Sequence, residues 1–413
     1  MRVLIVTHYF PPEAGAPQAR LSALAAVWAA DGDDVTVLTG MPNHPSGALP
    51  PMYRRTVLCR EMAGSYRVVR TWLYATPSEG MVRKTLSHLS FMASSVLLGW
   101  RAVGPADVVL VSSPTFSSVL AGWLLAKVKR ARFVVEVRDL WPAILVELGV
   151  LANRRVIAVL ERLELAAYRA ADEVVVVSDG FRSDLIRRGI PASKVHTICN
   201  GADVVRFAVA EDAERGWRAR LGAGPEDCLV LYAGTHGICQ SLNAVAGAAS
   251  LLASRPVGSS VRFAFVGDGA GKRCLEERVE ELGLHNTVLL PGIPNGEMPR
   301  LLAAADVCLV PLRDAPLFAS SIPAKLFEYL AAGKAVIGSV AGEAAEILAE
   351  AGAAVVPPED SESLAAAIST LAADRELREL MGKTGRVFVE ESYDRTTLCR
   401  EYRKVLDLAC VRR

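Results

Sequence analysis

The residues with the clearest chemical potential lie in the stretch 320–334. Its pattern predicts a helix that begins near Pro323 and ends near Gly333, because proline suits a first helical turn and glycine suits a helix end. Lys325 and Glu328 are three residues apart, so they share one face of this helix. A lysine beside a helix start can bind a diphosphate, and a carboxylate one turn later can accept hydrogen bonds from both hydroxyls of a ribose. The alternative is an ordinary surface ion pair.

A second charged pair follows the apolar run 132–137, which we expect to form a strand. Arg138 and Asp139 come directly after it and precede Trp141 and Pro142. At the carboxyl end of a strand, Asp139 can lie in a binding cleft beside an acceptor hydroxyl. The alternative is a structural contact between Arg138 and Asp139 that caps the next helix.

The first loop of the chain contains one glycine, Gly15, just before an expected helix over 17–30. Free backbone N–H groups at such a helix start suit a phosphate. A turn that requires a positive φ explains the same glycine equally well. The G-x-G-x-x-G fingerprint is missing from this loop, which argues against NAD binding.

A glycine-rich loop over 266–273 follows a strand-like run in the second half of the chain. Gly267 and Gly269 allow a close backbone approach to a nucleoside, or they form a plain turn. The loop is not a P-loop, because Val266 and Arg273 stand where that motif requires glycine and serine or threonine.

The strands that must position these loops are nearly all apolar, and they alternate along the chain with helical stretches rich in alanine and leucine. This pattern is typical of parallel sheets covered on both faces, and right-handed crossovers then give a doubly wound α/β fold. The pattern restarts near residue 228, after a linker at 201–227. We predict an N-terminal domain over 1–205 and a C-terminal domain over 206–393, with the helix 394–413 packed on the first. Ligands should bind at the carboxyl ends of the strands, in a cleft between the domains.

Composition narrows the classes of partner. The 413 residues carry 46 basic and 45 acidic side chains, and the net charge of +1 argues against a nucleic-acid partner. The longest apolar stretch, residues 89–100, is too short to span a bilayer. Neither the eight cysteines nor the six histidines show metal-ligand spacing, so we expect no metal, reduced thiols and a cytoplasmic protein. We expect the D-x-D triplet at 31–33 to form a turn.

The stretch 48–101 is basic and lies next to an apolar run. It predicts peripheral contact with an anionic inner membrane face, or with a lipid-diphosphate acceptor. A solvated face beside an ordinary core helix is the alternative. The charged residues of the stretch are Arg54, Arg55, Arg60, Arg67, Arg70, Arg83, Lys84, Arg101, Glu61 and Glu79.

Five pieces of the chain together resemble the family-4 glycosyltransferases of GT-B fold. They are residues 8–15, 135–142, 200–207, 266–269 and 325–334. The pieces RDLWP and KLFEY are similar to the branch that includes N-acetyl-L-fucosamine transferases of cell-surface polysaccharide assembly. The resemblance implies two Rossmann-like domains that face each other across a cleft. It also implies retaining, metal-independent transfer from a nucleotide-diphosphate sugar, UDP favoured over GDP, to a hydroxyl of a lipid-linked glycan or a small-molecule acceptor.

The resemblance also implies roles for individual residues. Glu328 would bind the ribose and Lys325 the diphosphate, with Asp139 as the third catalytic residue. Arg138 and Asp139 stand where many relatives carry a histidine near the transferring centre, on the acceptor side together with Glu13. The remaining donor-binding residues would be Gly15, His236, Gly267, Gly269, Gly292, Ser320 and Ser321.

Two positions depart from the family pattern. Ser320 stands eight residues before Glu328, where the family's Glu-x7-Glu motif has its first glutamate. The segment 234–240 lacks the arginine and lysine that many relatives carry after the first strand of the second domain, so His236 or backbone amides would serve instead.

Two other functions fit the same architecture. A sugar-nucleotide 2-epimerase would convert a nucleotide sugar with no acceptor present. A non-catalytic nucleotide-sugar binding protein would bind the donor without turnover, and Ser320 in place of a glutamate makes this conceivable.

Overall fold

The computed structural model describes residues 1–13, 15–44, 46–77, 80–113, 116–208, 214–255, 258 and 260–411. Two residues of the motifs and charges above, Ala14 and Glu79, lie outside this part of the chain. The chain divides into two compact units. Unit 1 comprises Met1–Cys199 and Thr396–Arg413, and unit 2 comprises Asn200–Arg395. The observed division after Cys199 lies six residues before the boundary that the sequence predicts.

Unit 1 is built on an eight-stranded sheet with the order β3-β4-β2-β1-β5-β6-β7-β8. Every neighbouring pair is parallel except β3 and β4, which are antiparallel. The chain order reverses between β1 and β5, which is a topological switch point of the kind where open α/β sheets bind ligands. The strands are β1 (Arg2–Val6), β2 (Asp34–Gly40), β3 (Leu58–Ala63), β4 (Tyr66–Thr71), β5 (Val108–Ser112), β6 (Arg132–Val137), β7 (Glu173–Val176) and β8 (Val195–Thr197).

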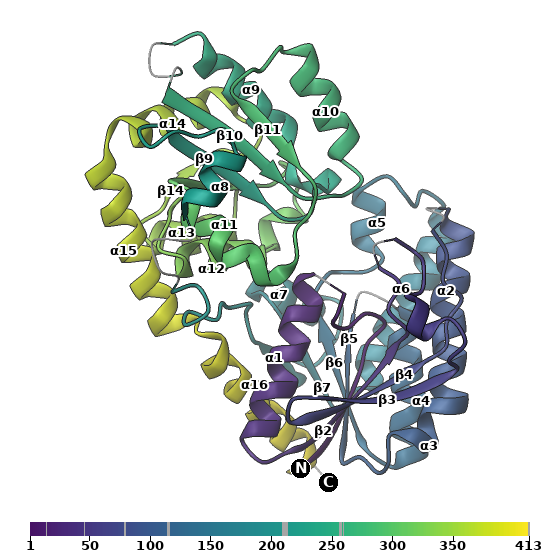
Figure 1. Ribbon diagram of the computed structural model, residues 1–413. Helices are drawn as coiled ribbons and strands as arrows, with labels where there is room; N and C mark the ends of the chain where they lie inside the picture. Colours follow the sequence, from purple (N-terminus) through teal and green to yellow (C-terminus); the bar gives the residue numbers. More distant parts are fainter. Residues whose placement is uncertain are drawn as a thin grey trace. The chain divides into compact units, whose positions relative to one another are not determined.

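Helices cover both faces of this sheet (Figure 1). On one face Trp28 and Tyr402 belong to a buried cluster with Ile5, and the Trp28 indole donates a hydrogen bond to the Cys399 carbonyl at 2.7 Å. The C-terminal helix α16 therefore completes the core of unit 1. The helices are α1 (Ala16–Ala30), α2 (Met81–Ser94), α3 (Trp100–Ala102), α4 (Phe116–Lys129), α5 (Ala143–Glu147), α6 (Arg154–Ala170), α7 (Asp179–Arg187) and α16 (Arg395–Val411).

Unit 2 contains a six-stranded, fully parallel sheet with the order β11-β10-β9-β12-β13-β14. This is the Rossmann order, with its switch point between β9 and β12. Its strands are β9 (Cys228–Ala233), β10 (Val261–Val266), β11 (Thr287–Leu290), β12 (Val307–Pro311), β13 (Ala335–Ser339) and β14 (Ala354–Val356). Its helices are α8 (Glu214–Arg220), α9 (Leu242–Ala253), α10 (Lys272–Glu281), α11 (Met298–Ala304), α12 (Ala324–Ala331), α13 (Glu343–Glu350), α14 (Ser361–Ala373) and α15 (Arg375–Ser392).

The chain passes between the units twice, and the two passages are hydrogen-bonded to each other on the unit 2 side. The Ala202 N–H donates to the Tyr393 carbonyl at 3.1 Å, and the Arg395 N–H donates to the Ala202 carbonyl at 2.9 Å. The Arg395 guanidinium also donates to the Gly201 carbonyl at 2.7 Å. These bonds join segments that are almost two hundred residues apart in the sequence.

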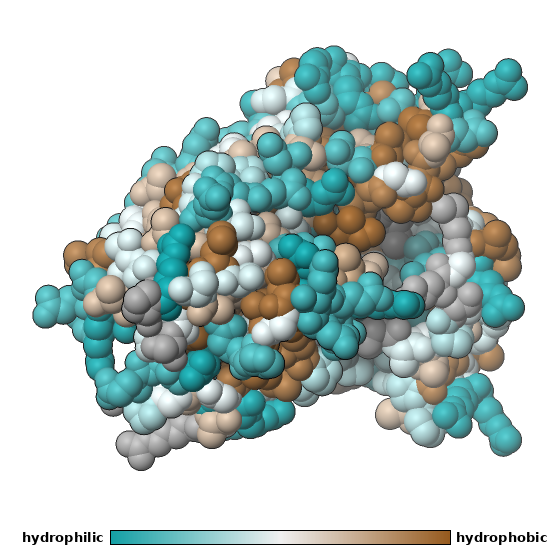
Figure 2. Space-filling model, turned by 90° about the horizontal axis from the view of Figure 1, so that it is seen from above, coloured by the Kyte–Doolittle hydropathy of each residue, from teal (hydrophilic) through white to brown (hydrophobic). Residues whose placement is uncertain are grey.

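A helix that spans a membrane must be both long and apolar. Among the described helices none is both long enough and apolar enough to span a membrane. Seen from above, hydrophobic residues reach the surface as separate patches among hydrophilic ones (Figure 2).

Candidate active site

In unit 2 the loops that follow β9, β10 and β11 are bound to one another at the carboxyl end of the sheet. The His236 N–H donates to the Asp268 carbonyl at 2.9 Å, and the Gly271 N–H donates to the His236 carbonyl at 2.7 Å. The Gly267 N–H donates to the Leu290 carbonyl at 3.0 Å, and the Gly292 N–H to the Asp268 carboxylate at 2.7 Å. These contacts hold the three glycine-containing loops together as one surface at the carboxyl end of the sheet, which we call the glycine floor.

Two glycines of the glycine floor are required by the packing of one loop on another. A Cβ on Gly267 would lie 1.8 Å from the Gly234 carbonyl oxygen, and one on Gly269 would lie 2.4 Å from the His236 carbonyl oxygen. No heavy atom fits at such distances. The glycine pattern therefore has a structural cause in addition to the nucleoside approach that the sequence predicts.

Replacing Gly267 with alanine should lower the free energy of unfolding by about 1–3 kcal/mol, because the new methyl group forces apart the loops that follow β9 and β10. Donor binding should weaken with it. Chemical denaturation measures the first effect and calorimetric titration the second. Gly296→Ala is the matched control, since a Cβ there meets nothing within 4 Å. Equal stability of both variants would contradict the packing argument.

Lys325 lies in the first turn of α12 and reaches back to the end of β9. Its ammonium group hydrogen-bonds to the Tyr232 hydroxyl and lies 3.7 Å from the centre of the Tyr232 ring, a cation–π distance. A Cβ on Gly234 would lie 3.1 Å from the Lys325 Nζ. Burial lowers the pKa of Lys325 to about 7. The lysine is therefore held at the switch point with much of its water removed, and no carboxylate among the described residues is bonded to it.

Tyr329 fixes the position of α12 against the same strand. Its hydroxyl donates to the Ala233 carbonyl at 2.7 Å and accepts from the Ala233 N–H at 2.9 Å. Both groups of the last β9 residue are thus occupied by one side chain of α12. The helix that carries Lys325 and Glu328 is therefore anchored to the sheet one turn beyond Lys325, at the residue next to Glu328.

Glu328 keeps part of its surface exposed, and one described cation lies beside it. The Arg395 guanidinium is 3.6 Å from its carboxylate, at the passage where the same arginine binds the Gly201 carbonyl. This distance leaves lone pairs of Glu328 free to accept hydrogen bonds from a ligand.

His236 is fully buried, and neither ring nitrogen has a hydrogen-bond partner. Burial, reinforced by the positive charges of Lys272 and Lys325, lowers its pKa to about 4. The imidazole is therefore neutral near pH 7, so it does not supply the charge of the family's missing arginine and lysine. It offers one N–H donor and one acceptor nitrogen.

Ser320 and Ser321 lie just before α12. Ser320 ends a short 3-10 turn, Phe318–Ser320, and the Ser321 N–H donates to the Phe318 carbonyl at 3.0 Å. Both serines are partly buried. Unit 2 thus holds every predicted donor-binding residue except Gly15, which precedes α1 in unit 1.

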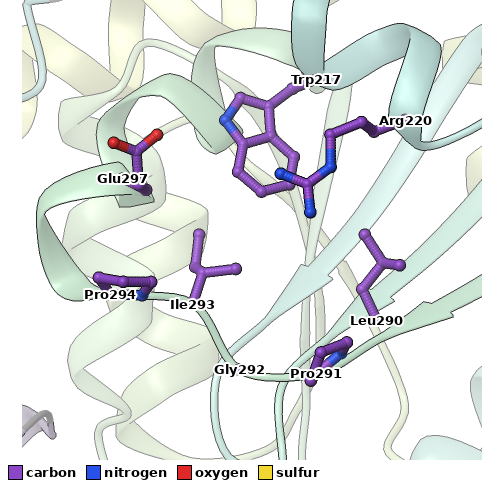
Figure 3. A pocket seen from close by; sticks show the side chains of 8 residues that line it. All are labelled: Trp217, Arg220, Leu290, Pro291, Gly292, Ile293, Pro294 and Glu297. Atoms are coloured by element: carbon purple, nitrogen blue, oxygen red, sulfur yellow. The ribbon is translucent and has the colours of Figure 1, made fainter.

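A pocket of about 320 Å³ lies beside Gly292, between α8 and the loop after β11 (Figure 3). The Arg220 guanidinium stacks over the Trp217 ring at 4.2 Å, and both side chains face the loop across the pocket. Gly292, one of the expected donor-binding residues, lines this pocket. The lining residues are Trp217, Arg220, Leu290, Pro291, Gly292, Ile293, Pro294 and Glu297.

The remaining predicted residues belong to unit 1. The buried Glu13 carboxylate accepts from the backbone N–H groups of Phe10 at 3.0 Å and of Asn43 and His44 at 2.8 Å each. Glu13 therefore ties the loop after β1 to the loop after β2. Gly15 precedes α1 with an extended backbone, and a Cβ there would meet only the flexible end of Gln18.

Arg138 and Asp139 directly follow β6. The Arg138 N–H donates to the Ser113 hydroxyl at 3.3 Å. Asp139 is exposed, and α5 has no side-chain cap, so a capping role for Asp139 is not observed. Protein groups around Asp139 displace part of its hydration water, and this desolvation raises the pKa of its carboxyl. The positive charge of Arg138 opposes this shift. An exposed carboxylate at a strand's carboxyl end is suited to orient an acceptor hydroxyl.

One buried ion pair beside this loop was not predicted from the sequence. Arg20 donates to Glu136 at 2.8 Å and to the backbone carbonyls of Cys199 and Ile198. The Ser112 hydroxyl donates to the same carboxylate at 2.7 Å. The separation of 116 residues between Arg20 and Glu136 leaves no local pattern that could reveal the pair.

The described residues contain no group of three or more histidine, cysteine, aspartate or glutamate side chains arranged to hold a metal ion. Both carboxylates of the D-x-D triplet form ion pairs with basic groups of the chain. Asp31 pairs with Arg400 at 3.0 Å, and Asp33 pairs with the N-terminal amine at 2.7 Å and with Arg403.

Two doubly wound units with a lysine-bearing helix at the switch point define a GT-B glycosyltransferase architecture. Residues 15–201 match the glycosyl transferase 4-like domain, and residues 214–388 match glycosyl transferases group 1. The chain belongs to the family-4 GT-B glycosyltransferases and uses a nucleotide sugar as donor.

Individual relatives agree with this assignment. The putative colanic acid biosynthesis glycosyl transferase WcaI of Escherichia coli K12 is 29% identical over 97% of this chain and 98% of its own length. Sucrose-phosphate synthase of Thermosynechococcus elongatus superposes with a TM-score of 0.75 at 20% identity, covering 98% of this chain and 97% of that one. HepE of Anabaena, in complex with UDP and glucose, superposes with a TM-score of 0.74 at 18% identity, covering 98% and 99%. The fold prediction is confirmed.

Proposed function

We propose that the protein transfers a sugar from a UDP-sugar to a hydroxyl of a lipid-linked glycan or a small-molecule acceptor, with retention at the anomeric carbon and without a metal. The single observation that carries the proposal is the desolvated Lys325 at the β9 switch point, anchored by Tyr232. HepE, whose fold this chain shares, has been crystallised with UDP-glucose, which favours UDP over GDP. The name of WcaI places that relative in polysaccharide biosynthesis, which favours a glycan acceptor.

Charge balance assigns the roles. The bond between the anomeric carbon and the diphosphate oxygen breaks, so positive charge grows on the sugar and negative charge on the diphosphate. Lys325 and the free N–H groups at the start of α12 stabilise that negative charge. The acceptor oxygen bonds to the anomeric carbon from the leaving-group side, and the departing phosphate takes its proton. Glu328 holds the ribose, and Asp139 orients the acceptor hydroxyl without deprotonating it.

Thermal unfolding with a panel of nucleoside diphosphates tests the donor. UDP at 100 times its dissociation constant should add about 2.7 kcal/mol to the free energy of unfolding. Stabilisation by GDP alone would overturn the UDP assignment. Incubating the chain with UDP-sugars should then release UDP when acceptor is present, and NMR of the product should show the donor's anomeric configuration. Conversion of the sugar nucleotide with no acceptor would identify an epimerase instead.

Peripheral membrane contact through residues 48–101 forms part of the proposal. Val82, Leu86 and Leu89 are exposed on one side of α2, and Leu97 is 72% exposed just beyond it. The exposed Arg83 and Lys84 lie among these side chains. An apolar stripe beside basic residues suits the headgroup region of an anionic bilayer. Two basic residues of the stretch do not contribute, because Arg70 is buried against Glu61 and Arg67 pairs with Asp34.

Vesicles that contain anionic lipid should bind the chain at low salt and release most of it at high salt, as flotation would show. Leu97→Gln should weaken this binding severalfold, because the leucine enters the headgroup region. Leu380→Gln is the control, since Leu380 is exposed on α15 of unit 2. Binding that ignores both salt and Leu97 would favour a soluble acceptor.

A further inference from the structure

Unit 1 contains a cluster of basic side chains that the proposed mechanism does not use. It comprises His8 after β1, His44 after β2, and Lys84 and His88 on α2. We call these four residues the histidine cluster. The ring centres of His8 and His88 are 4.6 Å apart, and Tyr9 links His8 to His44 through ring contacts of 4.4 and 5.3 Å. Lys84 and His88 are four residues apart, so they share one face of α2.

His8 is incompletely satisfied in this cluster. Only 2% of the residue is exposed, and neither ring nitrogen has a hydrogen-bond partner. A buried polar group without a partner costs free energy, so such groups in native proteins normally have a ligand or a water molecule. His236 shows the same feature at the equivalent point of unit 2, where it also follows a threonine after the first strand. His236 lies among the proposed donor-binding residues, so the matching position of His8 suggests that it too faces a ligand.

The histidine cluster also has no counter-ion among the described residues. Within the described part of the chain, no carboxylate forms an ion pair with His44, Lys84 or His88. Glu13 is close by in the sequence, but its oxygens accept three backbone N–H groups. The Lys84 charge adds to burial in lowering the pKa of both His44 and His88, as expected for basic groups with uncompensated charge.

We propose that the histidine cluster binds a phosphate or diphosphate group carried by the acceptor. Lys84 supplies the positive charge, and the histidine rings supply directed N–H donors from three different elements. A phosphate ester presents three strong acceptor oxygens, enough to meet donors from several sides. The cluster lies at the carboxyl ends of β1 and β2, the end at which doubly wound sheets bind ligands. The identification of this ligand with the acceptor rests on the proposed transferase function.

Calorimetric titration of the full chain with inorganic pyrophosphate tests the proposal. Saturating UDP is present throughout, so that the site around Lys325 is already filled. We expect one binding event, weakened about tenfold by Lys84→Gln and by His88→Gln. Both positions keep solvent contact, so these variants should fold. Lys127→Gln, an exposed lysine on α4 of the same unit, should bind as the unchanged protein does.

A parallel titration with farnesyl diphosphate separates the two sources of the anion. Tighter binding than pyrophosphate indicates a lipid-borne diphosphate, and equal binding indicates a water-soluble phosphorylated acceptor. No binding of either probe, or equal binding by all variants, overturns the inference. UDP binding measured in the same samples keeps the proposed function separate, because a normal UDP affinity with no pyrophosphate binding removes only the histidine cluster's role.

Discussion

Replacing Lys325 with alanine should lower the transfer rate by about 10²–10³-fold while the protein stays folded. In the proposed mechanism the lysine meets the charge that develops on the leaving diphosphate, so its interaction is stronger in the transition state than in the ground state. Its ammonium is bonded to Tyr232 rather than to a carboxylate, so its removal leaves no buried charge unpaired. Steady-state UDP release measures the rate, and circular dichroism with thermal unfolding measures the fold. Lys383→Ala, an exposed lysine on α15, is the matched control.

Because the pKa of Lys325 is lowered, we also expect the rate of the reaction to depend on pH. In the free enzyme Lys325 loses its proton as pH rises through about 7, so kcat/KM for the donor should fall above that pH. A bound diphosphate favours the charged form and raises the pKa of Lys325, so kcat should hold to higher pH than kcat/KM. Lys325→Arg keeps its charge at every accessible pH and should remove the decline. The same decline in that variant would assign it to another group.

Replacing Glu328 with alanine should raise KM for the donor and lower kcat/KM about 10- to 100-fold, since hydrogen bonds to a charged group are worth about 1.5–3 kcal/mol each. The fold should change little, because Arg395 keeps its bonds to the Gly201 carbonyl. Glu350→Gln, an exposed glutamate on α13, serves as the control.

A donor that lacks the ribose 2′-hydroxyl sharpens the Glu328 test. With the unchanged protein, kcat/KM for this donor should fall by nearly as much as the Glu328→Ala substitution lowers kcat/KM for the normal donor. Against Glu328→Ala it should lose almost nothing, because the two changes remove one interaction. Additive losses would show that Glu328 contacts something other than the ribose.

The sequence predicted the elements that follow from buried, apolar periodicity. A helix from near Pro323 to near Gly333 was expected, and α12 spans Ala324–Ala331. The edge strand β3 was missed, because its sequence LCREMA mixes charged and apolar residues without a continuous apolar run. The apolar stretch 89–100 does not form one regular α-helix, since a π-helical segment, Ser95–Gly99, separates α2 from α3.

The arrangement of side chains was less predictable than the backbone. Lys325 was expected to meet a diphosphate, but its partner Tyr232 lies 93 positions away, on a strand that the pattern only identifies as buried. His236 was a candidate substitute for a missing cation, and its burial makes it neutral instead. Glu13 was placed on the acceptor side, and its backbone contacts with Asn43 and His44 depend on how two loops fold together. Such partners are set by tertiary packing, which local spacing does not encode.

The segments where the chain enters and leaves unit 2 contact α12 and the residues just before it. Asn200 donates to the Ile322 carbonyl at 3.4 Å, and Arg395 faces Glu328. Under the proposed role of Glu328, the ribose hydroxyls of the donor and the Arg395 guanidinium share one carboxylate. The same guanidinium holds the Gly201 carbonyl, so the proposed ribose contact lies one side chain away from the point where the chain enters unit 2.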